Sequence, residues 1–259
     1  MPEEERPPQR RDKVRLRQPA LPDGDVLTLL ATAPITGFGL HPLGSNHVFV
    51  VKLESEAVGE PFYGIYKPQA GERPLRDFPR GTLYRRECAA YELSVALGWP
   101  SIPPTVVREG PHGVGSVQLF IDADPYANFF TMREKELSTF EAVAAFDLLA
   151  NNADRKAGAC LKDPAGRVWA IDQGLTFNPY ALQRTVMWEF CGEPIAKRLI
   201  ADMERVRPQL DRKSRLGCRL AELLVEGELE ALCERAERIT AKPIFPLLDP
   251  NYNVPWPLV

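Results

Sequence analysis

Two aspartates are spaced as a phosphoryl-transfer site requires. Such chemistry needs a lysine near phosphates, a metal held by carboxylates and a base that aligns the acceptor. Asp154 ends an expected helix in FDLLANNADR, and Asp172 follows in WAIDQGLTF, just before a glycine. A hairpin between them is expected to bring both acids to its mouth, as a base and a metal ligand. The pattern leaves one alternative open, in which both aspartates lie in ordinary turns and have no chemical role.

A lysine precedes these acids at the end of an expected strand. Lys67 lies in GIYKPQ, in an alternation of apolar and polar residues that usually turns a lysine towards solvent. The functional alternative is a compact cation on the α- and β-phosphates of a nucleotide, held by a glutamate of the following helix. Glu87 is the candidate for that glutamate, and Glu92 is second because it falls later in the helix.

The elements that must position these residues form a β-rich half followed by a helical half. Apolar runs bounded by turn residues predict strands over 26–31, 47–53, 62–67, 105–109 and 116–122, and a helix over 81–98 that Gly98 ends. Ser138 and Glu141 fit a capping box that opens a helix through about Asn151. A turn at 163–166 predicts a second hairpin, and the pattern from Pro194 to Ala241 is helical.

This order of elements predicts an α+β protein with the two-lobed protein-kinase-like fold. We expect a flexible N-terminal arm over residues 1–20 and an N-lobe over 21–122, which holds the nucleotide-binding sheet, one helix and the hinge. The C-lobe is expected over 123–259, with the catalytic loop, the metal-binding hairpin, the later helices and a Pro-rich tail.

Composition excludes several classes of function. Among 259 residues, 32 Lys and Arg stand against 35 Asp and Glu, so the formal charge of −3 argues against a nucleic-acid binder. No apolar stretch has the roughly 20 residues of a membrane span, and the charged N-terminus is unlike a signal peptide. The five cysteines lie too far apart for a zinc knuckle or a disulfide framework, which favours reduced thiols in a cytoplasmic protein.

Five blocks in register resemble the type II phosphatidylinositol 4-kinase branch of the phosphatidylinositol 3- and 4-kinase superfamily, and in particular a group of bacterial proteins similar to those kinases. The blocks are GSNHVFVV, YGIYKPQAGERPL, GSVQLF with DADPYANFF, FDLLANNADR and WAIDQGLTF, over about residues 37–177. Asp147, seven residues before Asp154, matches a polar position of the family motif. The bacterial HipA-type serine kinases share a similar Asn-x-Asp-Arg loop and are the second relative.

The resemblance implies a role for each matching residue. Asp154 would be the catalytic aspartate, Arg155 its neighbour in the loop, and Asp172 the aspartate that binds Mg²⁺ or Mn²⁺. Lys67 would contact the phosphates of ATP, with Glu87 as its partner. Gly44 and Ser45 would belong to the phosphate-covering loop. The hinge, which holds adenine through backbone groups, would consist of Gln118, Leu119, Phe120 and Ile121.

Two positions depart from the family pattern. An asparagine that binds a second metal usually stands five residues after the catalytic aspartate, where this chain has Ala159, and Gln173 after the metal aspartate is atypically polar. A slow or one-metal phosphotransferase acting on a soluble small molecule or a protein hydroxyl is therefore expected. A nucleotide-binding pseudokinase and AMP transfer on the same fold are the alternatives, and the sequence does not indicate the oligomeric state.

Overall fold

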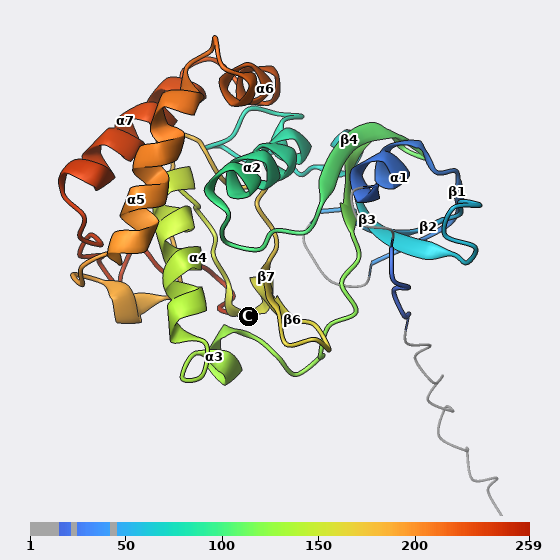
Figure 1. Cartoon of the computed structure of the whole chain (residues 1–259), viewed down its shortest axis with the longest axis horizontal. Helices are drawn as coiled ribbons and strands as arrows, with labels where there is room; N and C mark the ends of the chain where they lie inside the picture. Colours follow the sequence, from blue (N-terminus) through green and yellow to red (C-terminus); the bar gives the residue numbers. More distant parts are fainter. Residues whose placement is uncertain (1–15, 22–24, 42–45) are drawn as a thin grey trace, which may run out of the picture.

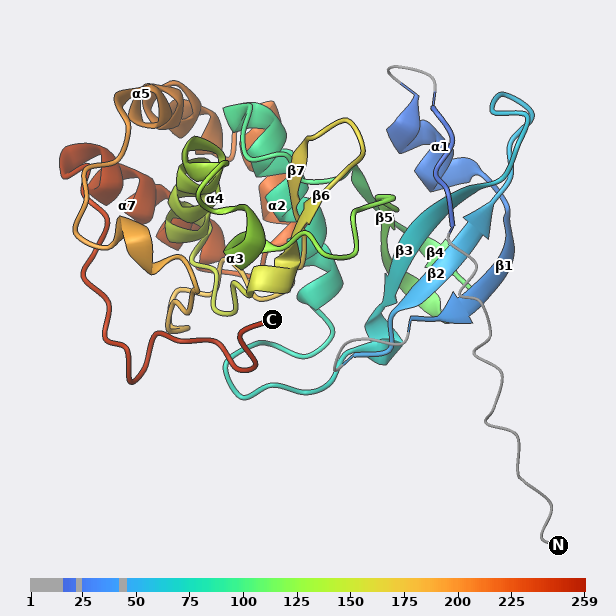
Figure 2. The ribbon, with the colours of Figure 1, turned by 90° about the horizontal axis from the view of Figure 1, so that it is seen from below.

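An antiparallel sheet forms one end of the molecule, and helices form the other (Figure 1 and Figure 2). The computed structural model describes residues 16–21, 25–41 and 46–259. The sheet has the order β1-β2-β3-β5-β4 and every neighbouring pair is antiparallel. Its strands are β1 (Ile35–Leu40), β2 (Phe49–Leu53), β3 (Phe62–Pro68), β4 (Thr105–Gly110) and β5 (Gly113–Leu119). This combination of sheet and helices confirms the α+β, kinase-like fold predicted from the order of elements.

Four of the five predicted strands are present, and the fifth prediction is wrong. Residues 26–31 belong to a helix, α1 (Val26–Thr32), that covers the sheet. The reason is the spacing of the buried side chains: Val26, Leu29, Leu30 and Ala33 recur at i, i+3, i+4 and i+7, which places them on one helical face. β1 was not predicted from the sequence, and the predicted strand over 116–122 begins earlier, at Gly113, and ends at Leu119.

Alternation along β3 decides where its lysine points. Phe62, Gly64, Tyr66 and Pro68 are buried on one face, whereas Tyr63, Ile65 and Lys67 are partly exposed on the other. Because side chains of a strand alternate between faces, Lys67 shares its face with Tyr63 and Ile65. It stands near the end of the strand, where its side chain reaches Glu87 and Asp172.

The helix α2 (Leu83–Leu97) follows β3 and ends, as predicted, at Gly98, whose φ of 85° gives the left-handed C-terminal cap. Its buried face packs into the core of the helical part rather than into the core under the sheet. Cys88, Leu93 and Leu97 are members of that core. The division at residue 122 stays a prediction, but α2 precedes it in the chain while sharing the core that follows it.

The helical part is built on α4 (Leu137–Ala150), with the short helix α3 (Phe129–Met132) before it. A hairpin of β6 (Cys160–Lys162) and β7 (Val168–Ala170) follows, as predicted. The capping box predicted for Ser138 and Glu141 is wrong. The N-cap residue is Glu136, and the Glu141 carboxylate instead accepts a hydrogen bond from the backbone amide of Ala196 at 2.8 Å.

The predicted helical region after Pro194 contains three α-helices. They are α5 (Lys197–Val206), α6 (Arg215–Leu223) and α7 (Glu228–Ala241), with a short 3₁₀ turn at Arg207–Leu210 after α5. Other 3₁₀ turns lie earlier in the chain, at Gln69–Gly71, Ala157–Ala159 and Trp188–Phe190. The last residues return towards the hairpin, so the C-terminus lies beside the segment between α4 and β6 (Figure 1).

Three further observations bear on the predictions. All five cysteines are free thiols, and Cys88 and Cys160 are fully buried. The side chain of Gln18 accepts a hydrogen bond from the amide of Tyr63 at 3.0 Å, so the end of the predicted arm is attached to the sheet, whereas residues 1–15 lie outside the described residues. Within the described residues, every helix is too short or too polar to cross a membrane.

Candidate active site

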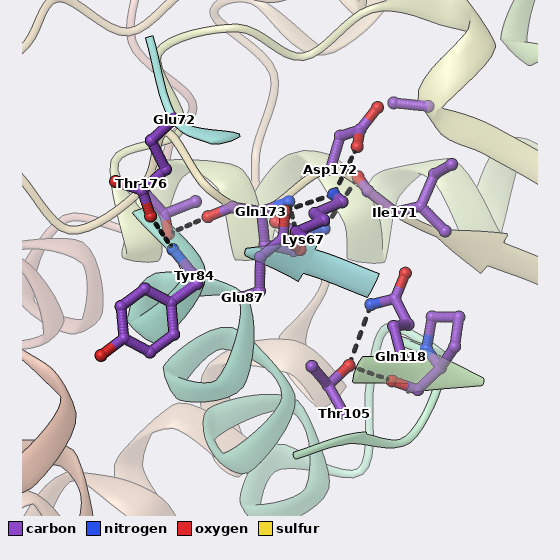
Figure 3. A network of polar contacts seen from close by, with 12 residues as sticks. Lys67, Glu72, Tyr84, Glu87, Thr105, Gln118, Ile171, Asp172, Gln173 and Thr176 are labelled. Carbon is purple, nitrogen blue, oxygen red and sulfur yellow. Dashed lines mark hydrogen bonds and ion pairs between the residues drawn. The ribbon is translucent and has the colours of Figure 1, made fainter. Parts of the chain in front are cut away.

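Lys67, Glu87 and Asp172 meet where the sheet faces the helical part (Figure 3). The Lys67 ammonium donates to Glu87 Oε1 at 2.5 Å and to Asp172 Oδ1 at 2.7 Å. Glu87 is almost fully buried, Lys67 is about one-fifth exposed, and the Asp172 side chain is 63% exposed. The residues come from β3, from α2 and from the segment after β7, so the fold brings together three groups that the sequence had assigned to one site.

The opposite charges of Lys67 and Asp172 favour the ionised form of each group. Burial disfavours the charged ammonium, but Asp172 and Glu87 outweigh it and raise the pKa of Lys67 above its usual value. The positive charge of Lys67 lowers the pKa of Asp172, against the effect of burial. Lys67 and Asp172 therefore form an ion pair beside Glu87, and the open side of Asp172 faces solvent.

Glu87 also fixes the segment that carries Asp172. Its second oxygen, Oε2, accepts a hydrogen bond from the backbone amide of Gln173 at 3.0 Å. Glu92, the second candidate, pairs instead with Arg219 on the surface at 3.2 Å. The partner of Lys67 is thus Glu87, as the earlier position in the helix indicated.

Asp172 stands in an uncommon backbone conformation. Its φ is 57°, in the left-handed region that few non-glycine residues adopt. Such strain persists only where surrounding contacts impose it, and here the Gln173 amide bonded to Glu87 and the Asp172 carboxylate bonded to Lys67 do so. The turn aims the carboxylate at the lysine.

Arg155 is a structural centre of the predicted catalytic loop rather than a group at its surface. Its side chain is fully buried and binds both oxygens of Asp147, at 2.7 and 2.9 Å. It also donates to the carbonyl oxygens of Ala159 and Ile171 and to the side-chain oxygen of Gln173. The polar Gln173, a departure from the family pattern, is therefore explained as a buried partner of Arg155.

Asp154 lies beside this buried pair, with its side chain 31% exposed. Its backbone amide donates to the side chain of Asn152 at 2.9 Å, and Asn152 in turn donates to Asp147. Lys156 approaches the Asp154 carboxylate at 3.0 Å. Burial raises the pKa of Asp154, Lys156 opposes that rise, and the nearby charge of Asp172 adds to it. Asp154 is thus a partly exposed carboxylate on the segment that follows α4.

The position of the missing asparagine is closed. Ala159 is buried, and its carbonyl oxygen accepts hydrogen bonds from Arg155 and from the amide of Ile171. Across residues 16–21, 25–41 and 46–259 no group of three or more His, Cys, Asp or Glu side chains is arranged to hold a metal ion. Asp172 and Asp154 each contribute one carboxylate and are not part of a larger cluster. A bound metal would therefore complete its ligand set with groups outside the protein, such as phosphate oxygens and water.

The predicted hinge lies at the end of β5, where the chain leaves the sheet. Gln118 is buried and its side chain donates to Thr105 at 2.9 Å, so that side chain supports the sheet. The amides of Leu119 and Phe120 donate to the carbonyls of Pro104 and Tyr63. The amide of Ile121 has no acceptor among the described residues, so it is free to donate a hydrogen bond to the adenine ring of a nucleotide.

The predicted phosphate-covering residues, Gly44 and Ser45, lie outside the described residues. The residues after them are held by the loop that follows β3. The backbone amide of His47 donates to the carbonyl of Gly71 at 3.1 Å, and the amide of Arg73 donates to the Asn46 side chain at 2.9 Å.

One contributor was missed from the sequence. Arg86, next to Glu87 in α2, is fully buried and donates to the carbonyl of Thr176, at 3.0 Å, and to the carboxylate of Glu228. It ties α2 both to the segment after Asp172 and to the start of α7. A signal existed: a charged residue on the face of α2 that also carries Ala90 and Leu93 must have a buried partner.

The fold and this clustering of Lys67, Glu87 and Asp172 define a protein of the kinase-like class. The chain belongs to the family of Protein Rv2133c of Mycobacterium tuberculosis (strain ATCC 25618 / H37Rv), to which it is 32% identical over 268 residues, covering 90% of this chain and 95% of the relative. No established family model matches the chain.

Solved structures share the fold at low sequence identity. Hydra Fam20, in a structure with sugar, aligns with a TM-score of 0.55 and 17% identity over 83% of this chain and 86% of its own. The Golgi casein kinase aligns with a TM-score of 0.55 and 15% identity over 84% and 73% of the two chains. Its form with Mn and ADP bound gives 0.54 and 14%, over 84% and 74%. These neighbours establish a kinase-like fold, and they do not single out the phosphatidylinositol kinases.

Proposed function

We propose that this protein is an ATP-dependent phosphotransferase that uses Mg²⁺ or Mn²⁺ and acts on a soluble acceptor hydroxyl. The observation that carries the proposal is the ion-paired arrangement of Lys67 with Glu87 and Asp172 on the open face between sheet and helices. The solved neighbour with Mn and ADP supports the choice of nucleotide and metal. The same proposal includes a relationship to the phosphatidylinositol 3- and 4-kinases, which the motif resemblance supports. It also includes a cytoplasmic location, which the five free thiols support.

The carboxylates fit a divalent ion that keeps most of its ligands outside the protein. Asp172 has a largely exposed carboxylate with one oxygen bonded to Lys67, and Asp154 is partly exposed nearby. Mg²⁺ typically binds one or two carboxylates and completes its shell with phosphate oxygens and water. Asp172, with Asp154 nearby, would hold a metal that supplies charge neutralisation for phosphates, while Ala159 supplies no side-chain ligand for a second ion.

Each residue of the chain then has a task. Lys67, held by Glu87, would bind phosphate oxygens as a point charge. Asp154 would accept a hydrogen bond from the acceptor hydroxyl and orient it for attack, and Arg155 would hold the loop through Asp147. The amide of Ile121 would donate a hydrogen bond to the adenine ring. Electrostatic stabilisation by fixed groups supplies most of the barrier reduction in such reactions.

Isothermal titration with ATP in Mg²⁺, in Mn²⁺ and in EDTA tests the proposal. Wild-type protein should bind ATP only with metal, Asp172→Asn should lose that binding, and Asp154→Asn should keep it while losing turnover. The two variants are matched, because each replaces an aspartate carboxylate of the same face by an amide. Binding that survives in Asp172→Asn would overturn the assignment of the metal aspartate, and no binding in any condition would overturn the proposal.

The pseudokinase alternative rests on one observation, the closed position of Ala159, whose backbone is already used by Arg155. Metal-dependent ATP binding without detectable turnover would favour that alternative. Mass analysis of a reacted acceptor separates phosphate transfer from AMP transfer, because the two products differ in added mass.

A further inference from the structure

The loop between β3 and α2 carries three arginines that the fold does not use. Arg73, Arg76 and Arg80 are exposed, and none of their guanidinium groups has a hydrogen-bond or ion-pair partner among the described residues. Most other arginines of the molecule, such as Arg155, Arg86 and Arg205, are bonded. Residues 72–80 hold these three cations and two acids, Glu72 and Asp77, so the stretch has a positive excess of one charge in a chain whose formal charge is −3.

Two of the three arginines line one small hollow. Arg73 and Arg80 share it with Gln69, Glu72, Phe78 and Leu83, among others, and its volume is about 150 Å³. Arg76 is not part of the lining. Pockets that enclose a whole small ligand have about 300–1,000 Å³, so this hollow has room for one end of a ligand. The side-chain amide of Gln69 donates to the carbonyl of Gly81 at 3.0 Å and closes one wall.

Glu72 places an unsatisfied acceptor in this loop. Its Oε1 accepts the amide of Tyr84 at 2.9 Å, at the start of α2 (Figure 3). Its Oε2 is buried and has no hydrogen-bond partner in the part of the chain that the structure describes. A buried carboxylate oxygen without a donor is unfavourable by roughly 1–3 kcal/mol or more, so a ligand hydroxyl would satisfy it once the Glu72 carboxylate turns towards the hollow.

The loop is attached to the proposed catalytic loop. Phe78 and Leu83, which line the hollow, form one apolar cluster with Ala153, the residue before Asp154. The side chain of Asn178 donates to the carbonyl of Asp77 and fastens the loop from the other side. The wall of the hollow is therefore packed against the segment that carries Asp154.

We propose that this hollow is an acceptor subsite, in which Arg73 and Arg80 bind a phosphate or carboxylate group and Glu72 Oε2 accepts a hydrogen bond from a neighbouring hydroxyl. The acceptor is then a small hydroxylated acid, whose remaining hydroxyl reaches Asp154. The acceptor role rests on the proposed function. No bond forms or breaks in the hollow itself, so the subsite is a binding and positioning element.

Side-chain NMR of arginine Nε–H groups tests the subsite in the full chain. The probes are glycerol 3-phosphate, glycerate and inorganic phosphate, with glycerol as the neutral counterpart. We expect the Arg73 and Arg80 signals to shift with the anionic probes and not with glycerol. Whether glycerol 3-phosphate or glycerate binds more tightly identifies phosphate or carboxylate as the preferred anion.

Three substitutions and one matched control sharpen the test. Arg73→Gln and Arg80→Gln should each weaken glycerol 3-phosphate binding by about tenfold, the value of one charge-assisted hydrogen bond. Arg76→Gln removes the same charge from the same loop outside the hollow and should change binding less than about twofold. Glu72→Gln keeps an acceptor for Tyr84 and should abolish the preference for glycerol 3-phosphate over inorganic phosphate. Equal weakening by Arg76→Gln, or no shift at Arg73 and Arg80, would overturn the subsite.

Failure of the subsite and failure of the proposed function are separable. Probe binding at Arg73 and Arg80 should persist in Asp172→Asn, in which Mg·ATP binding is lost. Mg·ATP binding without any shift at the two arginines overturns the subsite and leaves the phosphotransferase. Probe binding in a wild-type protein that never binds Mg·ATP overturns the acceptor role.

Discussion

The backbone amide of Gln173 donates to Glu87 Oε2 at 3.0 Å, while Glu87 Oε1 holds the Lys67 ammonium at 2.5 Å. One buried carboxylate of α2 thus fixes both the lysine of β3 and the turn that presents Asp172. Arg86 secures the same helix to Thr176 and Glu228 through hydrogen bonds that are fully buried. A displacement of α2 would leave several of these groups unpaired, so the arrangement is assembled by the fold itself.

This double role of Glu87 predicts a large effect of Glu87→Ala. The substitution leaves the buried Gln173 amide without an acceptor and the buried Lys67 with one carboxylate fewer. We expect the free energy of unfolding to fall by about 2–4 kcal/mol and Mg·ATP binding to weaken at least about tenfold. Urea unfolding and ATP titration measure the two effects.

Glu92→Ala is the matched control, because it removes the same group from the same helix where it pairs with Arg219 near the surface. It should change stability far less and leave ATP binding unchanged. Equal effects of the two substitutions would show that Glu87 acts only through helix stability.

The raised pKa of Asp154 predicts how turnover depends on pH. Burial raises this pKa, and only the ionised carboxylate accepts the acceptor proton or hydrogen bond, so turnover should rise with pH through that pKa. Lys156 lowers the pKa by a hydrogen bond and by its charge. Lys156→Met should therefore move the acidic limb of the kcat/KM profile to higher pH. Asp172, whose pKa Lys67 lowers, stays ionised across this range.

Lys162→Met provides the comparison for this profile. Lys162 pairs with Glu136 at 2.6 Å, on the hairpin strand β6, and its loss removes the same charge from a pair that does not involve Asp154. The limb should stay in place in that variant. A shift of the Lys156→Met limb to lower pH would contradict the assignment of the limb to Asp154.

The buried pair of Arg155 and Asp147 should be required for folding. Asp147→Asn leaves a fully buried guanidinium facing an amide of nearly the same shape, and we expect a loss of about 3–5 kcal/mol in the free energy of unfolding. Arg212→Gln, at the exposed pair with Glu230, should have little effect. Urea unfolding of the two variants checks the difference, and similar losses would show that the Arg155 network is not specially stabilising.

Much of the site was predictable because its residues stand at fixed places in regular elements. Lys67 ends an alternating strand, and Glu87 lies one turn into a helix that Gly98 ends, so local periodicity located both residues in their elements. The alternation itself favoured a solvent-facing lysine, and the resemblance to the kinase family is what implied its pairing with Glu87. Glu141 shows the limit: its spacing from Ser138 suggested a cap, but the amide that it accepts belongs to Ala196, 55 residues away. A local pattern contains no information about such a distant partner.

The errors within the sheet have a different origin. The apolar run VLTLLA is compatible with a strand or a helix, and only the spacing of Leu29, Leu30 and Ala33 favours the helix. Strand β1 contains Gly37 and Gly39, residues that weaken a strand pattern, and it is held by pairing with β2. The buried pair of Arg86 with Glu228 joins residues 142 apart, so neither side chain indicated the other.

The last segment of the chain should determine the rigidity of the proposed catalytic loop. Asn253 is buried, its carbonyl oxygen accepts the amide of Thr185 at 3.0 Å, and its side chain donates to the carbonyl of Gln183 at 2.6 Å. The residues between these two points bond directly to the loop of Asp154. The amide of Arg155 donates to the carbonyl of Arg184 at 2.9 Å, and the amide of Arg184 donates to Asn152.

Asn253→Ala keeps the backbone contact but removes the side-chain hydrogen bonds. We expect the amides of Arg155 and Thr185 to exchange with solvent about tenfold faster, as the loss of roughly one hydrogen bond implies. Turnover should fall while the Kd for Mg·ATP stays unchanged, because Lys67 and Asp172 are held from α2. Asn251→Ala, which removes an exposed contact with Asp249 two residues earlier, is the control. Faster exchange spread evenly over the molecule would show global destabilisation and would contradict a positioning role for Asn253.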